Sequence, residues 1–104
     1  VVPFVMPELS TLTMAAIRSL SQDPDGFFLM VEGASVDSAA HANNLPQLVE
    51  EMLAFNRAVE AVIGWVEAES SWDETLLIVT TDHGNGLFLG PDSDTIAFQD
   101  PVAG

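Results

Sequence analysis

The stretch that decides the fold reads Phe27-Phe-Leu-Met-Val-Glu-Gly-Ala-Ser-Val-Asp-Ser-Ala-Ala-His41. Its first five residues form a short, continuous apolar run, which is typical of a strand buried on both faces. The run ends at Glu32, and Asp37 and His41 follow among glycine and other small residues. A buried strand that leads into a loop with a carboxylate and an imidazole is a common way to build a metal site at a sheet edge.

A second stretch repeats this design and reads Thr75-Leu-Leu-Ile-Val-Thr-Thr-Asp-His-Gly-Asn85. Its apolar run, Leu76–Thr80, is predicted to be a second strand. Asp82 and His83 follow the run directly. The chain has two histidines, and each lies beside or shortly after an acid that follows a predicted strand. This placement favours ligand roles for both histidines over roles as isolated surface or core residues.

Two helices are predicted on either side of the first stretch. Pro7 and Glu8 open the first, and apolar residues at helical spacing continue to Leu20. The second runs from Pro46 to about Ser70 and carries a wide apolar stripe. Residues 32–44 between the first strand and the long helix are predicted to be a loop.

The order strand, ligand loop, helix, strand implies parallel strands joined by a right-handed crossover. The predicted fold class is therefore α/β, a βαβ unit with parallel strands plus one preceding helix. Each strand then ends at the same carboxyl edge of the sheet, where open α/β sheets bind ligands. The side chains that we expect to meet at this edge as metal ligands are Glu32, Asp37, His41, Asp82 and His83.

The chain ends carry weaker signals. Leu87–Leu89 and Thr95–Phe98 are predicted to pair weakly as strands, with Asp92 and Asp94 in a solvated turn between them. The chain begins at Val1 without an initiator methionine and contains no signal peptide. We therefore expect residues 1–104 to be a single partial domain of a longer protein.

The composition sets limits on the partners. The chain has 104 residues, 48% of them hydrophobic, which suits one small domain with a core. Sixteen acidic residues face two arginines and no lysine, giving a net charge of −14. This charge argues against nucleic acid and anionic membranes as partners and favours bound cations. It suits a protein that works in high salt, and equally an ordinary acidic fragment.

The available ligand types restrict the metals. Because the chain has no cysteine, a metal must be held by carboxylate and imidazole. Imidazole with carboxylate suits zinc, and carboxylates alone suit magnesium. Several metals close together suggest phosphoryl or sulfuryl transfer, since they can hold the attacking and leaving oxygens. Spacing alone thus favours a metal site and leaves a phosphatase as one option.

The pattern Val31-Glu-Gly-Ala-x-x-Asp-x-x-x-His41, followed by Val79-Thr-Thr-Asp-His-Gly84, resembles the metal-binding half of alkaline phosphatases. The similarity covers about residues 7–86. It implies that the chain is a fragment of a three-layer α/β/α sandwich. It also implies two zinc ions and one magnesium ion, with Glu32 as the magnesium ligand. Asp37 and His41 would bind one zinc, and Asp82 and His83 the other.

The same resemblance implies a reaction. Phosphate monoesters would be hydrolysed through a phosphoserine intermediate, in the periplasm or outside the cell, and a homodimer is left open. The family's serine nucleophile, its neighbouring aspartate, its phosphate-binding arginine and a third zinc-binding histidine would all lie outside this chain. Ser38 is not that nucleophile, because Asp37 already fits the ligand pattern in register. We therefore expect no catalytic residue within the chain, and no activity from the chain alone.

Two other functions stay open. Asp82-His-Gly-Asn85 also occurs in cofactor-independent phosphoglycerate mutases of the same superfamily, so a phosphomutase is an alternative. The Val31-Glu-Gly-Ala34 pattern favours the phosphatase. After His83 the chain reads Gly-Asn-Gly, whereas the best-known alkaline phosphatases carry a further histidine there. A non-catalytic acidic module that binds cations is the second alternative.

Overall fold

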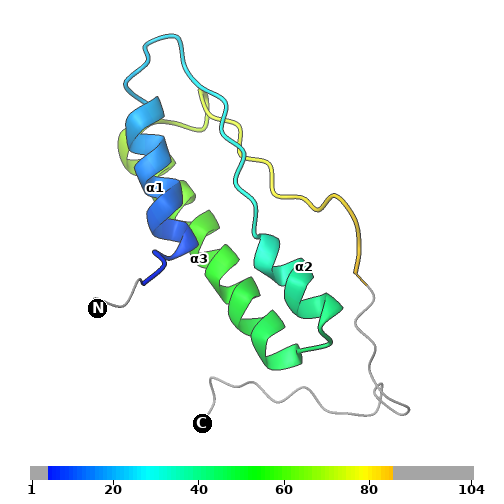
Figure 1. Cartoon of the computed structure of the whole chain (residues 1–104). Coiled ribbons are helices and arrows are strands. Elements are labelled where there is room, and N and C mark those ends of the chain that lie inside the picture. The colour runs from blue at the N-terminus through cyan, green and yellow to red at the C-terminus, as the bar shows by residue number, and fades with distance from the viewer. Residues whose placement is uncertain (1–4, 86–104) are drawn as a thin grey trace.

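The computed structural model describes residues 5–85, which contain three helices joined by extended segments. The helices are α1 (Leu9–Leu20), α2 (Ala34–His41) and α3 (Leu45–Glu69) (Figure 1). Both α1 and α2 pack against α3, which is the element that organises the described part of the chain.

The first helix forms where the apolar spacing predicted it. The carbonyl oxygen of Glu8 accepts a hydrogen bond from the backbone N–H of Leu12 at 3.1 Å, which begins the helical bonding. Ile17 and Thr13 are buried on one face. The Thr13 hydroxyl donates to the carbonyl oxygen of Leu9 at 2.7 Å, so this polar side chain is buried with its hydrogen bond satisfied.

The long helix also confirms its prediction, within a residue at each end. Asn44 precedes it, and its side-chain oxygen accepts a hydrogen bond from the backbone N–H of Gln47 at 3.3 Å. Pro46 lies in the first turn, where a missing N–H costs nothing. Ala58 and Val66 are its buried residues, and the aromatic Phe55 and Trp65 of α3 also contact other segments.

The second helix corrects the prediction of a loop over residues 32–44. α2 takes up most of that segment, and its Ala39 and Ala40 are buried. Gly33 precedes it, and a Cβ atom added there would lie 2.8 Å from Cδ2 of Phe55 on α3. That distance is shorter than real Cβ contacts, so a side chain at position 33 would force the Phe55 ring or the start of α2 to shift.

The predicted α/β fold is wrong for the part of the chain that the structure describes. Residues 5–85 contain helices and no strand, so there is no βαβ unit with parallel strands and no sheet of a sandwich. No backbone hydrogen bond within that range joins residues 27–31 to residues 76–80. Their apolar side chains are largely exposed, at 89% for Phe28 and 83% for Leu76.

The error has a physical cause. An apolar run indicates that a segment is suited to burial. To form a strand, the backbone N–H and C=O groups of that segment also need hydrogen-bonding partners on another strand. A helix satisfies its backbone internally, whereas a pair of parallel strands needs further strands and covered faces to be stable. The prediction that Glu32 and Asp82 end adjacent parallel strands is therefore wrong as well.

The two extended segments nevertheless share a direction. Residues 21–33 and residues 70–85 both lead from the end at which α1 and α3 finish toward the end at which α3 begins (Figure 1). Phe27 packs near Trp65 of α3, with ring centroids 6.1 Å apart. This path returns the chain toward α2, which brings residues 82–85 close to Asp37 on that helix.

Two predictions concern residues beyond this range. The weak strands Leu87–Leu89 and Thr95–Phe98, with Asp92 and Asp94 between them, lie outside the described residues. Among the helices in residues 5–85, none is both long and apolar enough to cross a membrane.

Candidate metal centre

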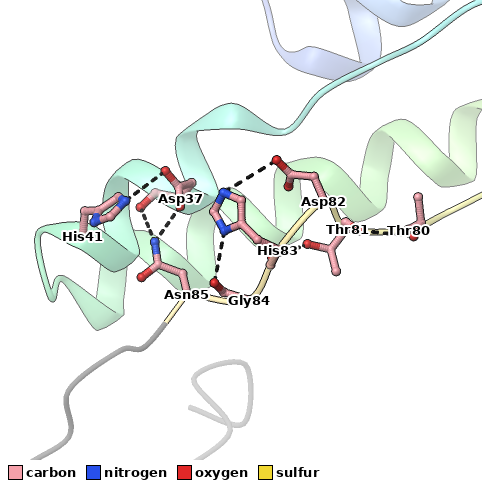
Figure 2. Close-up of polar contacts among 8 residues, drawn as sticks. All are labelled: Asp37, His41, Thr80, Thr81, Asp82, His83, Gly84 and Asn85. Carbon is pink, nitrogen blue, oxygen red and sulfur yellow. Dashed lines mark hydrogen bonds and ion pairs between the residues drawn. The ribbon is translucent and has the colours of Figure 1, made fainter.

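The first carboxylate–imidazole pair lies on α2. Asp37 and His41 are four positions apart on this helix, which puts their side chains on one face. Oδ2 of Asp37 lies 3.3 Å from Nε2 of His41 (Figure 2). The local fold thus brings these two predicted ligands together through a single helical turn.

The second pair lies in the extended segment that follows α3. Asp82 and His83 are sequence neighbours, and Oδ2 of the first lies 3.6 Å from Nε2 of the second (Figure 2). Nδ1 of His83 lies 3.1 Å from the carbonyl oxygen of Gly84. The Thr81 hydroxyl donates to the carbonyl oxygen of His83 at 2.6 Å, which bends the backbone around the histidine.

Asn85 joins the two pairs. Its side-chain amide donates to Oδ1 of Asp37 at 2.5 Å and to the carbonyl oxygen of the same residue at 3.4 Å (Figure 2). The other side-chain hydrogen bonds within residues 5–85 connect positions five or fewer apart, whereas this contact spans 48 positions. The loop after α3 is thereby attached to α2 at the carboxylate that belongs to the first pair.

The electrostatics of His83 follow from this arrangement. Its pKa is raised above the ordinary value of 6.5, first by the hydrogen bond to the Gly84 carbonyl, then by the charges of Asp82 and Asp37. All three favour the protonated imidazolium. A cation that bound His83 would have to displace this proton, so binding would weaken as the pH falls.

The separations within the pairs fit zinc. Two ligand atoms at ~2.0–2.1 Å from a tetrahedral zinc lie about 3.3 Å apart. In the pair on α2, the carboxylate oxygen and the imidazole nitrogen are 3.3 Å apart, which matches this separation. In the pair at residues 82–83 the corresponding atoms are 3.6 Å apart, which is about 0.3 Å more. The Nδ1–H of His83 can donate to the Gly84 carbonyl, which leaves Nε2 as the ligand atom, a common arrangement at metal sites.

The complete set of five predicted ligands is not assembled within the described residues. Glu32 is exposed, and no hydrogen bond or ion pair joins it to the other four within residues 5–85. No group of three or more His, Cys, Asp or Glu side chains in that range is arranged to hold a metal ion. Each pair therefore provides two ligands, and the metal assignment stays a prediction.

The two arginines lie on other elements. Arg57 of α3 makes an ion pair with Glu8, with Nε and Oε2 3.6 Å apart. Arg18 of α1 lines a shallow cavity beside Met14 and Trp65. Within residues 5–85 neither arginine makes an ion pair with a candidate ligand.

Sequence reasoning missed the contacts that hold the site together. Asn85 is not among the predicted site residues, although its place two positions after a predicted histidine ligand is a usable signal. Gly33 was seen as part of a motif, but its close approach to Phe55 depends on three-dimensional packing. Both residues act through partners that are distant in the sequence, and local patterns do not record such partners.

Comparison with known proteins identifies the family. The family model described as alkaline phosphatase matches residues 3–101. Alkaline phosphatase 3 of Bacillus subtilis is 37% identical over 98 residues, which cover 93% of this chain and 21% of that protein. The repressible alkaline phosphatase of Saccharomyces cerevisiae is 46% identical over 86 residues, covering 77% of this chain and 15% of that protein.

The alkaline phosphatase of Escherichia coli is 37% identical over 89 residues, which cover 85% of this chain and 18% of that protein. No solved structure matches the chain. The chain belongs to the alkaline phosphatase family. It spans about a fifth or less of the length of these relatives, between 15% and 21%.

Proposed function

We propose that this chain supplies metal ligands to a phosphatase that hydrolyses phosphate monoesters. The proposal rests on the positions of two carboxylate–imidazole pairs, one on α2 and one at residues 82–83. The hydrogen bond from Asn85 to Asp37 holds the segment that carries the second pair against α2. Membership of the alkaline phosphatase family supports the reaction class.

Each pair would hold one zinc ion. Asp37 and His41 form one pair and Asp82 and His83 the other, while Glu32 would be a ligand of magnesium. When bound, these cations would supply positive charge that stabilises phosphoryl transfer. A catalytic zinc has three protein ligands, so each pair needs one more from outside the described residues.

The chain's own residues would prepare these ligands. The bond from Nδ1–H of His83 to the Gly84 carbonyl selects the tautomer whose Nε2 is free to bind. The single helical turn between Asp37 and His41 fixes the spacing of the other pair. We further propose that the serine nucleophile, which would form a phosphoserine, and the phosphate-binding arginine lie outside these 104 residues. A periplasmic or extracellular location belongs to the same proposal.

The chain by itself should bind zinc weakly and hydrolyse nothing. Two ligands per zinc give low affinity, and magnesium keeps most of its waters when one carboxylate holds it. An assay with p-nitrophenyl phosphate at alkaline pH, with zinc and magnesium added, tests this. Turnover that His41→Ala and Asp82→Ala both abolish would show that the chain is a complete enzyme.

A chimera tests the function directly. The segment of Bacillus subtilis alkaline phosphatase 3 that matches this chain is replaced by the chain, and hydrolysis of p-nitrophenyl phosphate is measured. We expect the chimera to hydrolyse the ester, and Asp37→Ala, His41→Ala and His83→Ala each to remove most of that activity. Asn56→Ala, at an exposed position of α3, is the matched control and should leave activity unchanged.

A folded chimera that binds zinc but does not hydrolyse the ester would contradict the proposal. That result would favour the alternative of a non-catalytic cation-binding module. The relatives named above all carry phosphatase names, which favours the phosphatase over the phosphomutase alternative. Circular dichroism of each chimera separates loss of the site from loss of folding.

A further inference from the structure

Two threonines come directly before the loop pair, and they differ in what their hydroxyl groups contact. The Thr81 hydroxyl donates to the backbone carbonyl oxygen of His83 at 2.6 Å (Figure 2). The Thr80 hydroxyl lies 3.4 Å from the carbonyl oxygen of Thr81, which is longer than an ordinary hydrogen bond between two oxygens. Neither threonine is a candidate ligand, so the metal assignment does not account for the short bond of Thr81.

The bond from Thr81 acts on the peptide group that joins His83 to Gly84. The carbonyl group of His83 belongs to this planar peptide, so the bond restricts how the whole plane can turn. Gly84 follows, and a Cβ atom added there would meet nothing within 4 Å. Since a glycine in open space has a freely rotating backbone, hydrogen bonds are what fix the shape of the loop at this point.

The imidazole of His83 depends on the same short segment. Its Nδ1 lies 3.1 Å from the carbonyl oxygen of Gly84. The two contacts therefore lie on either side of the Gly84 α-carbon, one at the peptide before it and one at the peptide after it. Without the Thr81 bond, the Gly84 carbonyl can swing away from the ring, and Nε2 of His83 then loses its fixed direction.

Packing does little to hold this histidine. The His83 side chain is 57% exposed, and residues 75–85 contain no helix or strand. A ligand that is held in place before the cation arrives loses less conformational entropy on binding. The hydrogen bonds around Gly84 are thus the means by which this part of the loop prepares its imidazole.

We propose that Thr81 is a positioning residue for the loop pair, whose hydroxyl fixes the peptide after His83 and thereby directs Nε2 toward the cation. Thr81 acts through the histidine and touches neither the cation nor the substrate. This inference rests on the proposed function, because it assumes that His83 binds zinc. Residues that orient the ligands of a metal site contribute to its affinity without being ligands themselves.

Zinc titrations of the 104-residue chain, followed by the ring-nitrogen resonances of His83 and His41, test the proposal. Thr81→Val keeps the β-branched shape and removes the hydroxyl, whereas Thr81→Ser keeps the hydroxyl. We expect Thr81→Val to weaken zinc binding at His83 about 2- to 10-fold, the usual worth of one hydrogen bond. Thr81→Ser and the matched control Thr80→Val should bind as the wild type does. His41, on α2, should bind equally in all four proteins.

A second readout needs no metal. The order parameter of the Gly84 backbone N–H reports the motion of the peptide that the Thr81 bond fixes. In the metal-free chain we expect it to fall in Thr81→Val and to stay at the wild-type value in Thr81→Ser and Thr80→Val. An unchanged order parameter in Thr81→Val would overturn the inference, whatever the zinc result.

The remaining outcomes separate the two claims. If zinc binds His83 equally well in the wild type and Thr81→Val, or if Thr80→Val loses as much affinity, the positioning role is wrong while the proposed metal centre survives. Equal losses at His83 and His41 in Thr81→Val would show a general structural effect and would also overturn the role. If the wild-type His83 signals do not respond to saturating zinc, the proposed function fails at this pair, and the inference fails with it.

Discussion

The two ligand pairs differ in what holds them. Asp37 and His41 are held by a helix whose backbone hydrogen bonds are internal, and the Asp37 side chain is 44% exposed. Asp82 and His83 lie in a segment without regular structure, and the Asp82 side chain is 87% exposed. The same two residue types therefore form a preorganised pair on α2 and a looser pair in the loop.

This difference teaches how the site depends on its surroundings. On α2 the spacing of the ligands follows from helix geometry, and packing of Ala39 and Ala40 keeps the helix in place. In the loop the spacing depends on the Thr81 and Gly84 backbone contacts and on the bond from Asn85. The pair on α2 should bind a cation with less loss of conformational entropy.

The largest expected effect is the loss of zinc affinity when the histidine of either pair is replaced by alanine. His41→Ala should weaken zinc binding more than His83→Ala does, because only the first removes a preorganised ligand. Chelator competition on the 104-residue chain measures both. Equal losses, or a larger loss for His83→Ala, would remove the distinction between the pairs.

The next effect concerns the packing that positions α2. Gly33→Ala should destabilise the chain by about 1–3 kcal/mol, since the new methyl group overlaps the Phe55 ring. Gly64→Ala is the matched control, because a Cβ there meets nothing within 4 Å and alanine favours a helix. Urea denaturation compares the variants. A neutral or stabilising Gly33→Ala would show that α2 does not begin against α3.

The packing of α2 also shows where sequence reasoning stopped. α1 and α3 were predictable because apolar residues at helical spacing describe a helix that needs no distant partner for its backbone. α2 was missed because Ala34–His41 carries small and polar residues instead of an apolar stripe. The available signal was the four-residue spacing of Asp37 and His41, which suits one helical face.

The predicted strands failed for the opposite reason. Residues 27–31 and 76–80 are apolar enough for burial, but burial and strand pairing depend on other segments. The metal roles of the candidate ligands stay predictions, since no group of three or more His, Cys, Asp or Glu side chains in residues 5–85 is arranged to hold a metal ion. The pairing of Asp37 with His41 and of Asp82 with His83 follows from short spacings, whereas the link through Asn85 spans 48 positions and could not be predicted.

A smaller effect concerns salt. Sixteen acidic residues against two arginines impose repulsion that screening relieves. The thermal midpoint of the chain should therefore rise from low to molar potassium chloride. Sucrose, a neutral osmolyte, is the control, because salt also strengthens apolar burial. A flat or falling series in potassium chloride would contradict this expectation.

The smallest effect is the titration of His83. Its pKa should lie above 6.5, and Asp82→Asn should lower it more than Asp37→Asn, following the order of their contributions. A raised pKa means that the folded state binds the proton more tightly than the unfolded state. The resulting stabilisation is complete below pH 6.5 and is lost as the pH rises through the folded value. Nuclear magnetic resonance titration of both variants measures the pKa of His83 in each. A larger fall in that pKa for Asp37→Asn than for Asp82→Asn would contradict this expectation.

The central claim is that both pairs bind zinc through their histidine Nε2 atoms. Ring-nitrogen resonances of His41 and His83 are recorded for the 104-residue chain before and after saturating zinc, with binding checked independently by chelator competition. We expect the Nε2 signals of both rings to shift to metal-bound positions while Nδ1 of His83 stays protonated and bonded to Gly84. Bound zinc with both ring signals unchanged would contradict the claim.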